Sequence, residues 1–219
     1  MTQTQSTQGA IPEEGIAHED SPAGPEKDWS RKDDNGLAPR MAAASIVDEG
    51  LRSSQSIEEL LPRHTVDLSP RDRSLARAIA TVTFRRFGTL ERALHERMSQ
   101  GLPDSSGALR VVLLTAAAQL LFLDVPDHAA VDCAVRLIGE DKRRAGLRGF
   151  ANAVLRRIAR ERAMILAGSD ALADDTPGWL GRRWIRQYGE ERARAIAEMH
   201  GQEPPLDITV TSDPQAGRH

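Results

Sequence analysis

Apolar residues recur every three or four positions from Gly36 onward, and no alternating strand pattern is visible before Leu206. This spacing places apolar side chains on one face of a helix, whereas a half-buried strand would need strict alternation. The sequence therefore predicts an all-α protein. The expected helices cover residues 39–51, 56–61, 70–87, 90–98, 106–122, 128–138 and 141–162, and two further helices are expected to begin near Pro177 and Gly189.

Polar residues mark several of the expected helix starts. Ser56 and Ser69 each stand just before a helical pattern resumes, and Ser69 is followed by Pro70, which is typical of an N-cap and a first helical turn. Gly88 is expected to separate two helices, because glycine disfavours the helical conformation. The helix that ends at Phe122 is strongly apolar and is expected at the centre of the core.

The segment 141–162 combines an apolar stripe with concentrated positive charge. The stripe is formed by six residues at helical spacing: Leu147, Phe150, Ala151, Val154, Leu155 and Ile158. From Lys142 to Arg162, eight basic residues against one acidic residue, Glu161, give a net charge of +7 in a chain whose total is −3. Such a concentration is typical of phosphate binding. The alternative is a solvated helix face whose arginine stems cover apolar surface.

Cysteine, histidine and hydropathy limit the other chemistries. Cys133 is the single cysteine, which excludes a disulfide framework, a thiolate metal cluster and a Cys-X-X-Cys pair and suits a reducing cytosol. The six histidines lack metal-ligand spacing. The longest apolar run, 111–123, is too short to span a bilayer, and the polar N-terminus lacks a signal sequence. A soluble cytoplasmic protein with no metal and no membrane partner is predicted.

Four motifs together resemble the NusB-type RNA-binding domain, in the version found at the N-terminus of the Sun/Fmu (RsmB-like) ribosomal RNA cytosine-5 methyltransferases. They are 69–73 (SPRDR), 119–121 (QLL), 125–131 (VPDHAAV) and 149–157 (GFANAVLRR), and their order and spacing match over 37–162. The resemblance implies a bundle of two three-helix subdomains that binds RNA or docks it for a partner domain.

One face of the basic segment is the expected RNA contact. Arg148, Asn152, Arg156 and Arg160 follow at steps of four. Arginine can bind phosphate through two parallel hydrogen bonds, and short polar side chains can contact the 2′-hydroxyl. The candidate RNA-binding residues are Arg144, Arg148, Asn152, Arg156, Arg157 and Arg160, with Arg77 and Arg85 of the 70–87 helix as further candidates. For Asn152 the alternative is a buried amide that satisfies a helix terminus.

Composition and the resemblance together divide the chain into four parts. They are an acidic tail over 1–36, a NusB-like RNA-binding domain over 37–165, linker helices over 166–203, and the start of a catalytic half over 204–219. The tail is expected to be disordered, because it is polar and carries eight acidic and three basic residues. In the family the S-adenosylmethionine site and the catalytic cysteine lie downstream. The resemblance therefore implies no catalytic residue and no cofactor in this chain, and S-adenosylmethionine for the complete enzyme.

The expected function is RNA binding and substrate docking for a 16S ribosomal RNA cytosine-5 methyltransferase, with its own downstream catalytic domain as the second partner. One alternative is a stand-alone NusB-type transcription antitermination factor, against which the sequence beyond Arg162 argues. A structural bundle that does not contact RNA is another alternative.

Three further groups of residues have structural interpretations that compete with functional ones. Cys133 is expected to be a small core residue, and His128 a packing or capping residue in a first helical turn. Trp179, Trp184 and Tyr188 are expected to pack a helix on its neighbours, with stacking on RNA bases as the alternative.

Overall fold

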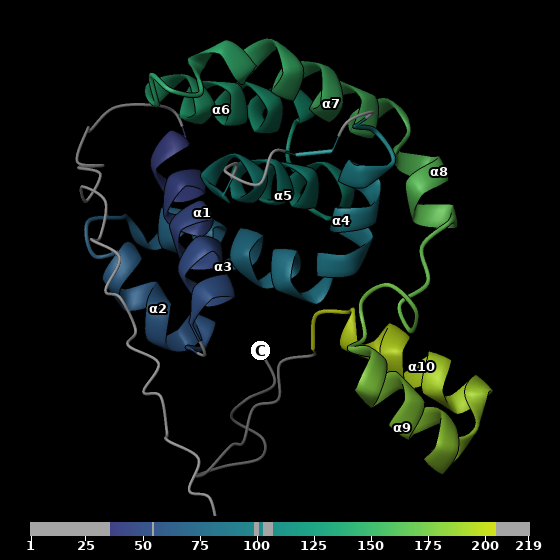
Figure 1. Cartoon of the computed structure of the whole chain (residues 1–219). Coiled ribbons are helices and arrows are strands. Elements are labelled where there is room, and N and C mark those ends of the chain that lie inside the picture. Colours follow the sequence, from purple (N-terminus) through teal and green to yellow (C-terminus); the bar gives the residue numbers. More distant parts are fainter. Residues whose placement is uncertain (1–35, 54, 99–100, 103–106, 205–219) are drawn as a thin grey trace, which may run out of the picture. The chain divides into compact units, whose positions relative to one another are not determined.

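The computed structural model describes residues 36–53, 55–98, 101–102 and 107–204, which belong to one compact unit. Within them the chain forms ten α-helices, one short 3-10 helix and no strand (Figure 1). The predicted all-α class is confirmed. Almost all of the predicted acidic tail, 1–36, and of the predicted start of a catalytic half, 204–219, lies outside the described residues. None of the described helices is long and apolar enough to cross a membrane.

The first three-helix group contains α1 (Leu37–Arg52), α2 (Ile57–His64) and α3 (Pro70–Arg85), each of which contacts the other two. Local capping sets the starts of two of them, as predicted. The Ser56 hydroxyl accepts the backbone N–H of Glu59, whose carboxylate accepts the N–H of Ser56 in return. The Ser69 hydroxyl accepts the backbone N–H of Asp72, and Pro70 occupies the first helical position.

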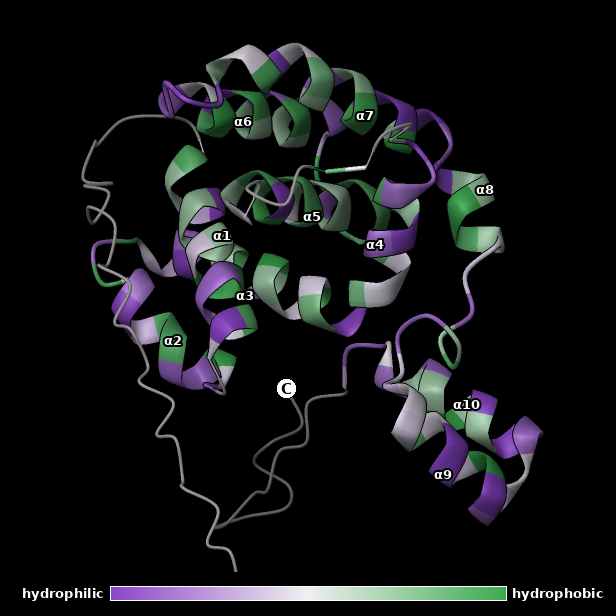
Figure 2. Ribbon diagram, in the orientation of Figure 1, coloured by the Kyte–Doolittle hydropathy of each residue, from purple (hydrophilic) through white to green (hydrophobic). Residues whose placement is uncertain are grey.

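The second three-helix group contains α5 (Gly107–Phe122), α6 (Asp127–Glu140) and α7 (Arg148–Arg160), with α4 (Phe87–His95) and α8 (Arg162–Ala167) packed against it. Helix α5 contacts α1, α3, α4, α6, α7 and α8, so it lies at the centre of the bundle, as predicted. It is predominantly hydrophobic along its length (Figure 2), which a helix surrounded on all sides by other helices requires.

A buried polar contact joins the two groups. Arg40 on α1 is buried, and its Nε donates to Oε1 of Gln119 on α5 at 2.7 Å. A terminal nitrogen of Arg40 also donates to the carbonyl oxygen of Gly36 at 2.8 Å, and Nε2 of Gln119 donates to the carbonyl oxygen of Thr115 at 2.9 Å. Each of these buried side chains therefore has hydrogen-bond partners that offset its removal from water.

The basic segment 141–162 is not one helix, and this prediction is wrong. A turn follows α6, the 3-10 helix η2 spans Ala145–Leu147, α7 begins at Arg148, and α8 begins after Glu161. Asp141 organises the turn, because its side chain and its carbonyl oxygen accept the backbone N–H groups of Arg143 and Arg144 at 3.1 and 2.8 Å. Gly146 adds to the interruption, since glycine is a poor helix former.

The two expected C-terminal helices are present as α9 (Gly178–Tyr188) and α10 (Glu190–His200), which pack against each other. Gly189 joins them with φ of 80°, a left-handed conformation that favours glycine. The predicted boundary between domain and linker at 165/166 falls inside α8. The division of the chain into four parts stays a prediction.

Candidate nucleic-acid interface

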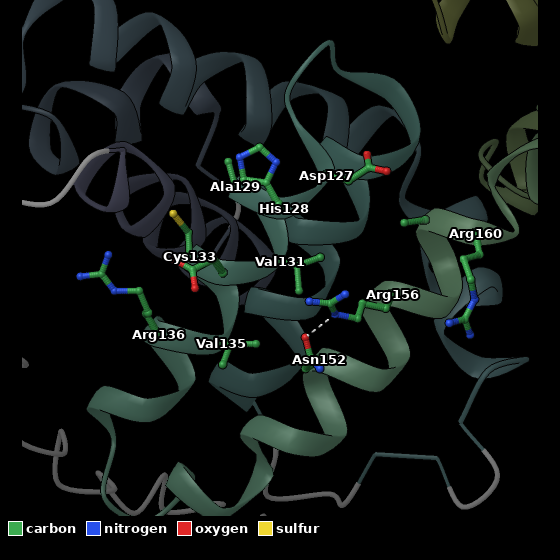
Figure 3. A pocket seen from close by; sticks show the side chains of 12 residues that line it. Asp127, His128, Ala129, Val131, Cys133, Val135, Arg136, Asn152, Arg156 and Arg160 are labelled. Carbon is green, nitrogen blue, oxygen red and sulfur yellow. Dashed lines mark hydrogen bonds between the residues drawn. The ribbon is translucent and has the colours of Figure 1, made fainter.

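Helices α6 and α7 lie side by side (Figure 1), and a hollow of about 730 Å³ opens between their exposed faces (Figure 3). The hollow contains three of the predicted RNA-binding residues, Asn152, Arg156 and Arg160. Its lining comes from α6 (Asp127, His128, Ala129, Val131, Asp132, Cys133, Val135, Arg136) and from α7 (Asn152, Arg156, Ala159, Arg160).

The amphipathic pattern of α7 determines which side chains reach this hollow. Ala151, Val154, Leu155 and Ile158 are buried against the core, which confirms the centre of the predicted apolar stripe. Leu147 and Phe150 are only partly buried. Because Arg148, Asn152, Arg156 and Arg160 repeat every four residues on the other side of the helix, packing of the stripe leaves that row at the surface.

Asn152 and Arg156 interact directly. Nε of Arg156 donates to Oδ1 of Asn152 at 2.9 Å, and Figure 3 shows the two side chains meeting beside Val131 and Val135 of α6. Asn152 is partly buried and Arg156 is exposed. The Asn152 amide therefore holds the Arg156 guanidinium group in place, while the two terminal nitrogens of the guanidinium group stay available for a ligand. The contact of the Asn152 side chain is with Arg156, and not with a helix terminus.

Arg148 lies at the start of α7, over the end of α6. A side chain at Gly139 would place its Cβ 2.8 Å from Cδ of Arg148, so the missing side chain makes room for the arginine. Nε of Arg148 donates to the carbonyl oxygen of Ala145 at 3.1 Å. Arg148 is exposed and does not line the hollow itself. It extends the positive charge of α7 toward the η2 turn.

Other candidate arginines already have carboxylate partners. Arg157 pairs with Glu161 at 2.8 Å, and Glu161 also pairs with the buried Arg97 at 2.9 Å. The hydrogen bond from Arg157, with the charges of both arginines, lowers the pKa of Glu161 and keeps this carboxylate ionised. Arg144 pairs with Asp141 at 2.9 Å, and Arg77 pairs with Glu58 at 3.1 Å.

Arg148, Arg156 and Arg160 differ from these paired residues. Over the part of the chain that the structure describes, none of the three forms an ion pair with a carboxylate. Arg85 lies on α3 with Arg77 and outside the hollow. The predicted RNA-binding arginines therefore form two groups. Arg148, Arg156 and Arg160 on α7 carry charges without carboxylate partners in the described part of the chain, whereas the other arginines are paired with carboxylates or, like Arg85, lie outside the hollow.

Sequence reasoning did not identify the contribution of α6 to this site. His128, Asp132 and Arg136 follow at steps of four along α6, and all three line the hollow. The same four-residue period that revealed the α7 row was therefore visible in α6. Of the packing or capping role expected for His128, the packing part is wrong, because the side chain is exposed, and the capping part stays a prediction. Asp127 and Asp132 also make the hollow mixed in charge rather than uniformly basic.

Cys133 has the structural role that was expected. It is 4% exposed and packs with Leu37 and Leu137, and burial raises the pKa of its thiol, which favours the unreactive protonated form. Among the described residues, no group of three His, Cys, Asp or Glu side chains is arranged to hold a metal ion.

Comparisons with known proteins agree with this architecture. The sequence model of the NusB family matches residues 38–160. Proteins named ribosomal RNA small subunit methyltransferase B are similar over a longer stretch. The protein from Xanthomonas campestris pv. campestris is 33% identical over 181 residues, which are 80% of this chain and 39% of that protein. The proteins from Xylella fastidiosa and Pectobacterium atrosepticum are 33% and 30% identical over 80% and 78% of this chain.

The chain spans about 40% of the length of these relatives. The resemblance identified from the sequence motifs is confirmed, as is the helical architecture that it implied. The family match begins within α1 and ends with α7, so it contains both three-helix groups. The chain belongs to the NusB family.

Proposed function

We propose that this chain is the RNA-docking part of a ribosomal RNA methyltransferase and that the exposed row of α7 contacts the RNA. The observation that supports this most directly is the set of exposed guanidinium groups of Arg148, Arg156 and Arg160, which lack carboxylate partners in the described part of the chain. The relatives are named for the small ribosomal subunit RNA, so 16S ribosomal RNA is the proposed ligand.

The geometry suits backbone recognition of folded RNA. Arg156 is held at Nε by Asn152 and lines the hollow, so its terminal N–H groups are left for a ligand there, and Arg160 lies about one turn further along α7. Guanidinium groups in such a row can bind successive phosphates. Asp132 on the α6 side offers an acceptor for a 2′-hydroxyl or an exocyclic amino group, contacts that a purely basic surface lacks.

Methyl transfer is not proposed for this chain alone. The S-adenosylmethionine site and the cysteine nucleophile are proposed to lie in the larger part of the protein that corresponds to the rest of the relatives' length. Docking of RNA for that catalytic domain, in the cytoplasm, is the proposed role of the present helices. The match to methyltransferase relatives extends beyond the family match to 38–160, which favours this role over a stand-alone antitermination factor.

A salt series with a 16S ribosomal RNA fragment tests the proposal. The full chain should bind with affinity that falls steeply as salt rises, and Arg148→Ala/Arg156→Ala should bind more weakly, with a salt slope reduced by about 1.4 to 1.8 for the two lost phosphate contacts. Arg52→Ala/Arg63→Ala removes the same charge from α1 and α2, where both arginines are already paired with carboxylates.

This control pair separates a specific surface from net charge. A loss in the α7 variant that the control does not share supports the proposal. Absence of salt-dependent binding by the unmodified chain, or equal effects of the two double substitutions, contradicts it.

A further inference from the structure

Helix α9 carries a tryptophan at the N-terminal end of an arginine face. Trp179, Arg182, Arg183 and Arg186 occupy positions i, i+3, i+4 and i+7, so their side chains project from one side of the helix. All four are exposed, and Trp179 is 62% exposed. An amphipathic helix that only packs on its neighbours would place its large aromatic residues on the opposite, buried side.

The other side of α9 makes the packing contacts. Gly181 is buried, and a Cβ there would lie 3.4 Å from a methyl group of Leu172. Trp184 stacks on His200 of α10, with ring centroids 5.2 Å apart and planes 7° from parallel. The predicted packing role is therefore confirmed for Trp184 and wrong for Trp179. Trp179 needs an explanation other than the fold of this hairpin.

The charge of the arginine face is also not neutralised locally. Helix α9 contains three arginines and no acidic residue, and none of the three forms an ion pair in the part of the chain that the structure describes. On the adjacent helix α10, by contrast, Arg194 pairs with both Asp170 and Glu190. The α9 face thus presents an exposed indole about one helical turn from the first of three cationic groups.

We propose that this face binds an unpaired RNA strand, with the indole of Trp179 stacked on a base and the guanidinium groups of Arg182, Arg183 and Arg186 on the flanking phosphates. Stacking on an aromatic side chain beside a basic track is the usual chemistry of single-strand binding, because every base offers a flat face. The four-residue step from Arg182 to Arg186 spreads the charge over about 6 Å of helix axis.

The inference rests on the proposed function for the identity of the ligand. It uses a different surface, which lies outside the family match to 38–160 and which does not include α7. The α6–α7 site would hold folded RNA by its backbone, and the α9 face would hold a strand whose bases are exposed. Together the two surfaces would select RNA in which a structured element adjoins an unpaired segment.

The test uses the full chain and a labelled oligouridine of about twelve nucleotides, a length within the range that single-strand sites cover. Trp179→Ala should bind about tenfold more weakly with an unchanged salt slope, because a stacking contact releases no counterions. Trp179→Phe should retain most of the affinity. Arg182→Gln/Arg183→Gln/Arg186→Gln should lower the salt slope by about 2.

Tyr188→Ala supplies the control, because Tyr188 is 48% exposed on α9 but is not on the arginine face. It should bind as the unmodified chain does. Thermal unfolding, monitored by circular dichroism, checks that each variant is folded. Folding is expected to be retained, because the substituted residues are exposed. Equal affinity of Trp179→Ala and Tyr188→Ala for the oligonucleotide overturns the inference. This is also the result expected if the face binds a protein partner instead of RNA.

The 16S ribosomal RNA fragment and Arg148→Ala/Arg156→Ala are measured in parallel to keep the two proposals distinct. If the α7 variant loses the fragment while Trp179→Ala leaves oligonucleotide binding unchanged, the α9 inference fails and the docking function stands. If the unmodified chain binds neither RNA, both fail.

Discussion

Asp175 caps the N-terminus of α4 from 86 residues away: its Oδ1 accepts the backbone N–H of Thr89 at 2.8 Å, and its Oδ2 accepts the Thr89 hydroxyl at 2.9 Å. Helix α4 has no side-chain cap of its own. The side chain of Asp175 is 5% exposed and lies 3.6 Å from a terminal nitrogen of Arg86. This one residue both satisfies a helix terminus and fastens the segment before α9 to the bundle.

Asp175→Ala should lower the free energy of unfolding by about 1 to 2 kcal/mol, the usual cost of removing a helix cap. Asp175→Asn should cost less, because its amide oxygen can still accept the Thr89 N–H while its NH₂ group donates to the hydroxyl. Urea titration of the variants gives the comparison, with the exposed Asp67→Ala as control. Equal costs for the two substitutions would contradict the capping role.

Gly88→Ala should be more damaging than a glycine substitution in a helix normally is. A Cβ at position 88 would overlap the carbonyl oxygen of Asp174 and lie 2.6 Å from its carbonyl carbon, and this obstacle is backbone that cannot rotate away. We expect a loss of about 2 to 3 kcal/mol, as for overpacking at a tight contact. Proteolysis within 168–176 should also become faster.

Gly149→Ala is the matched control, because a Cβ at this position of α7 would meet nothing within 4 Å. Replacing an unobstructed helical glycine should stabilise the protein by about 0.5 to 1 kcal/mol. Opposite signs for the two substitutions are expected in thermal unfolding. A stabilising Gly88→Ala would show that the α4 contact with Asp174 is looser than the structure indicates.

Gly88 also illustrates where sequence reasoning stops. The sequence predicts a break at this glycine between two helical patterns, yet Gly88 lies in the first turn of α4, where it allows close approach of Asp174. That reason depends on a partner far along the chain. Caps such as those of Ser56 and Ser69 were predictable because donor and acceptor are three residues apart.

The features of the candidate site also divide into local ones, which the sequence predicts, and long-range ones, which it does not. The exposed row of α7 follows from helical periodicity, and the pairing of Arg157 with Glu161 is a local i, i+4 contact. The pairing of Arg77 with Glu58 joins two helices, and the hollow requires the packing of α6 on α7. The exposed face of each helix could therefore be predicted from the sequence, but the packing of α6 on α7 that forms the hollow could not.

Gln119→Leu should destabilise the protein by about 3 kcal/mol, because it leaves the buried Arg40 guanidinium group without its side-chain acceptor. Arg40→Met/Gln119→Leu should be more stable than the sum of the two single substitutions predicts, since neither charge nor acceptor is then left unpaired. A double-mutant cycle in urea measures this coupling. Strictly additive costs would show that the contact between α1 and α5 contributes little.

Glu49→Gln should alter the acid stability of the first three-helix group. A hydrogen bond with His64, at 2.7 Å, and the charge of Arg63 lower the pKa of Glu49. A lowered folded-state pKa stabilises the protein above the unfolded-state pKa, and this contribution is lost as the pH falls through the folded-state pKa. The unmodified protein should exceed the variant in melting temperature at neutral pH.

This difference should disappear between about pH 5 and pH 3, where glutamate titrates and the uncharged glutamine does not. Melting temperatures measured at intervals across this range provide the check. The exposed Glu140→Gln should leave the profile nearly unchanged. A difference between Glu49→Gln and the unmodified protein that is independent of pH would assign the effect to packing rather than to charge.

Asn152 offers the sharpest test of how α7 uses its charge. Asn152→Asp places a carboxylate where the amide now accepts from Arg156, so the guanidinium group becomes paired as Arg157 already is. RNA affinity should fall, and the salt slope should fall by about 0.7 to 0.9, the value of one phosphate contact. Asn152→Ala keeps the charge of Arg156 but frees its side chain, so the slope should persist while affinity falls by a few-fold.

Ala153→Asp, on the neighbouring exposed position, adds the same negative charge without reaching the amide site. If it weakens binding as much as Asn152→Asp does, RNA responds to the overall charge of α7 and not to the positioned Arg156.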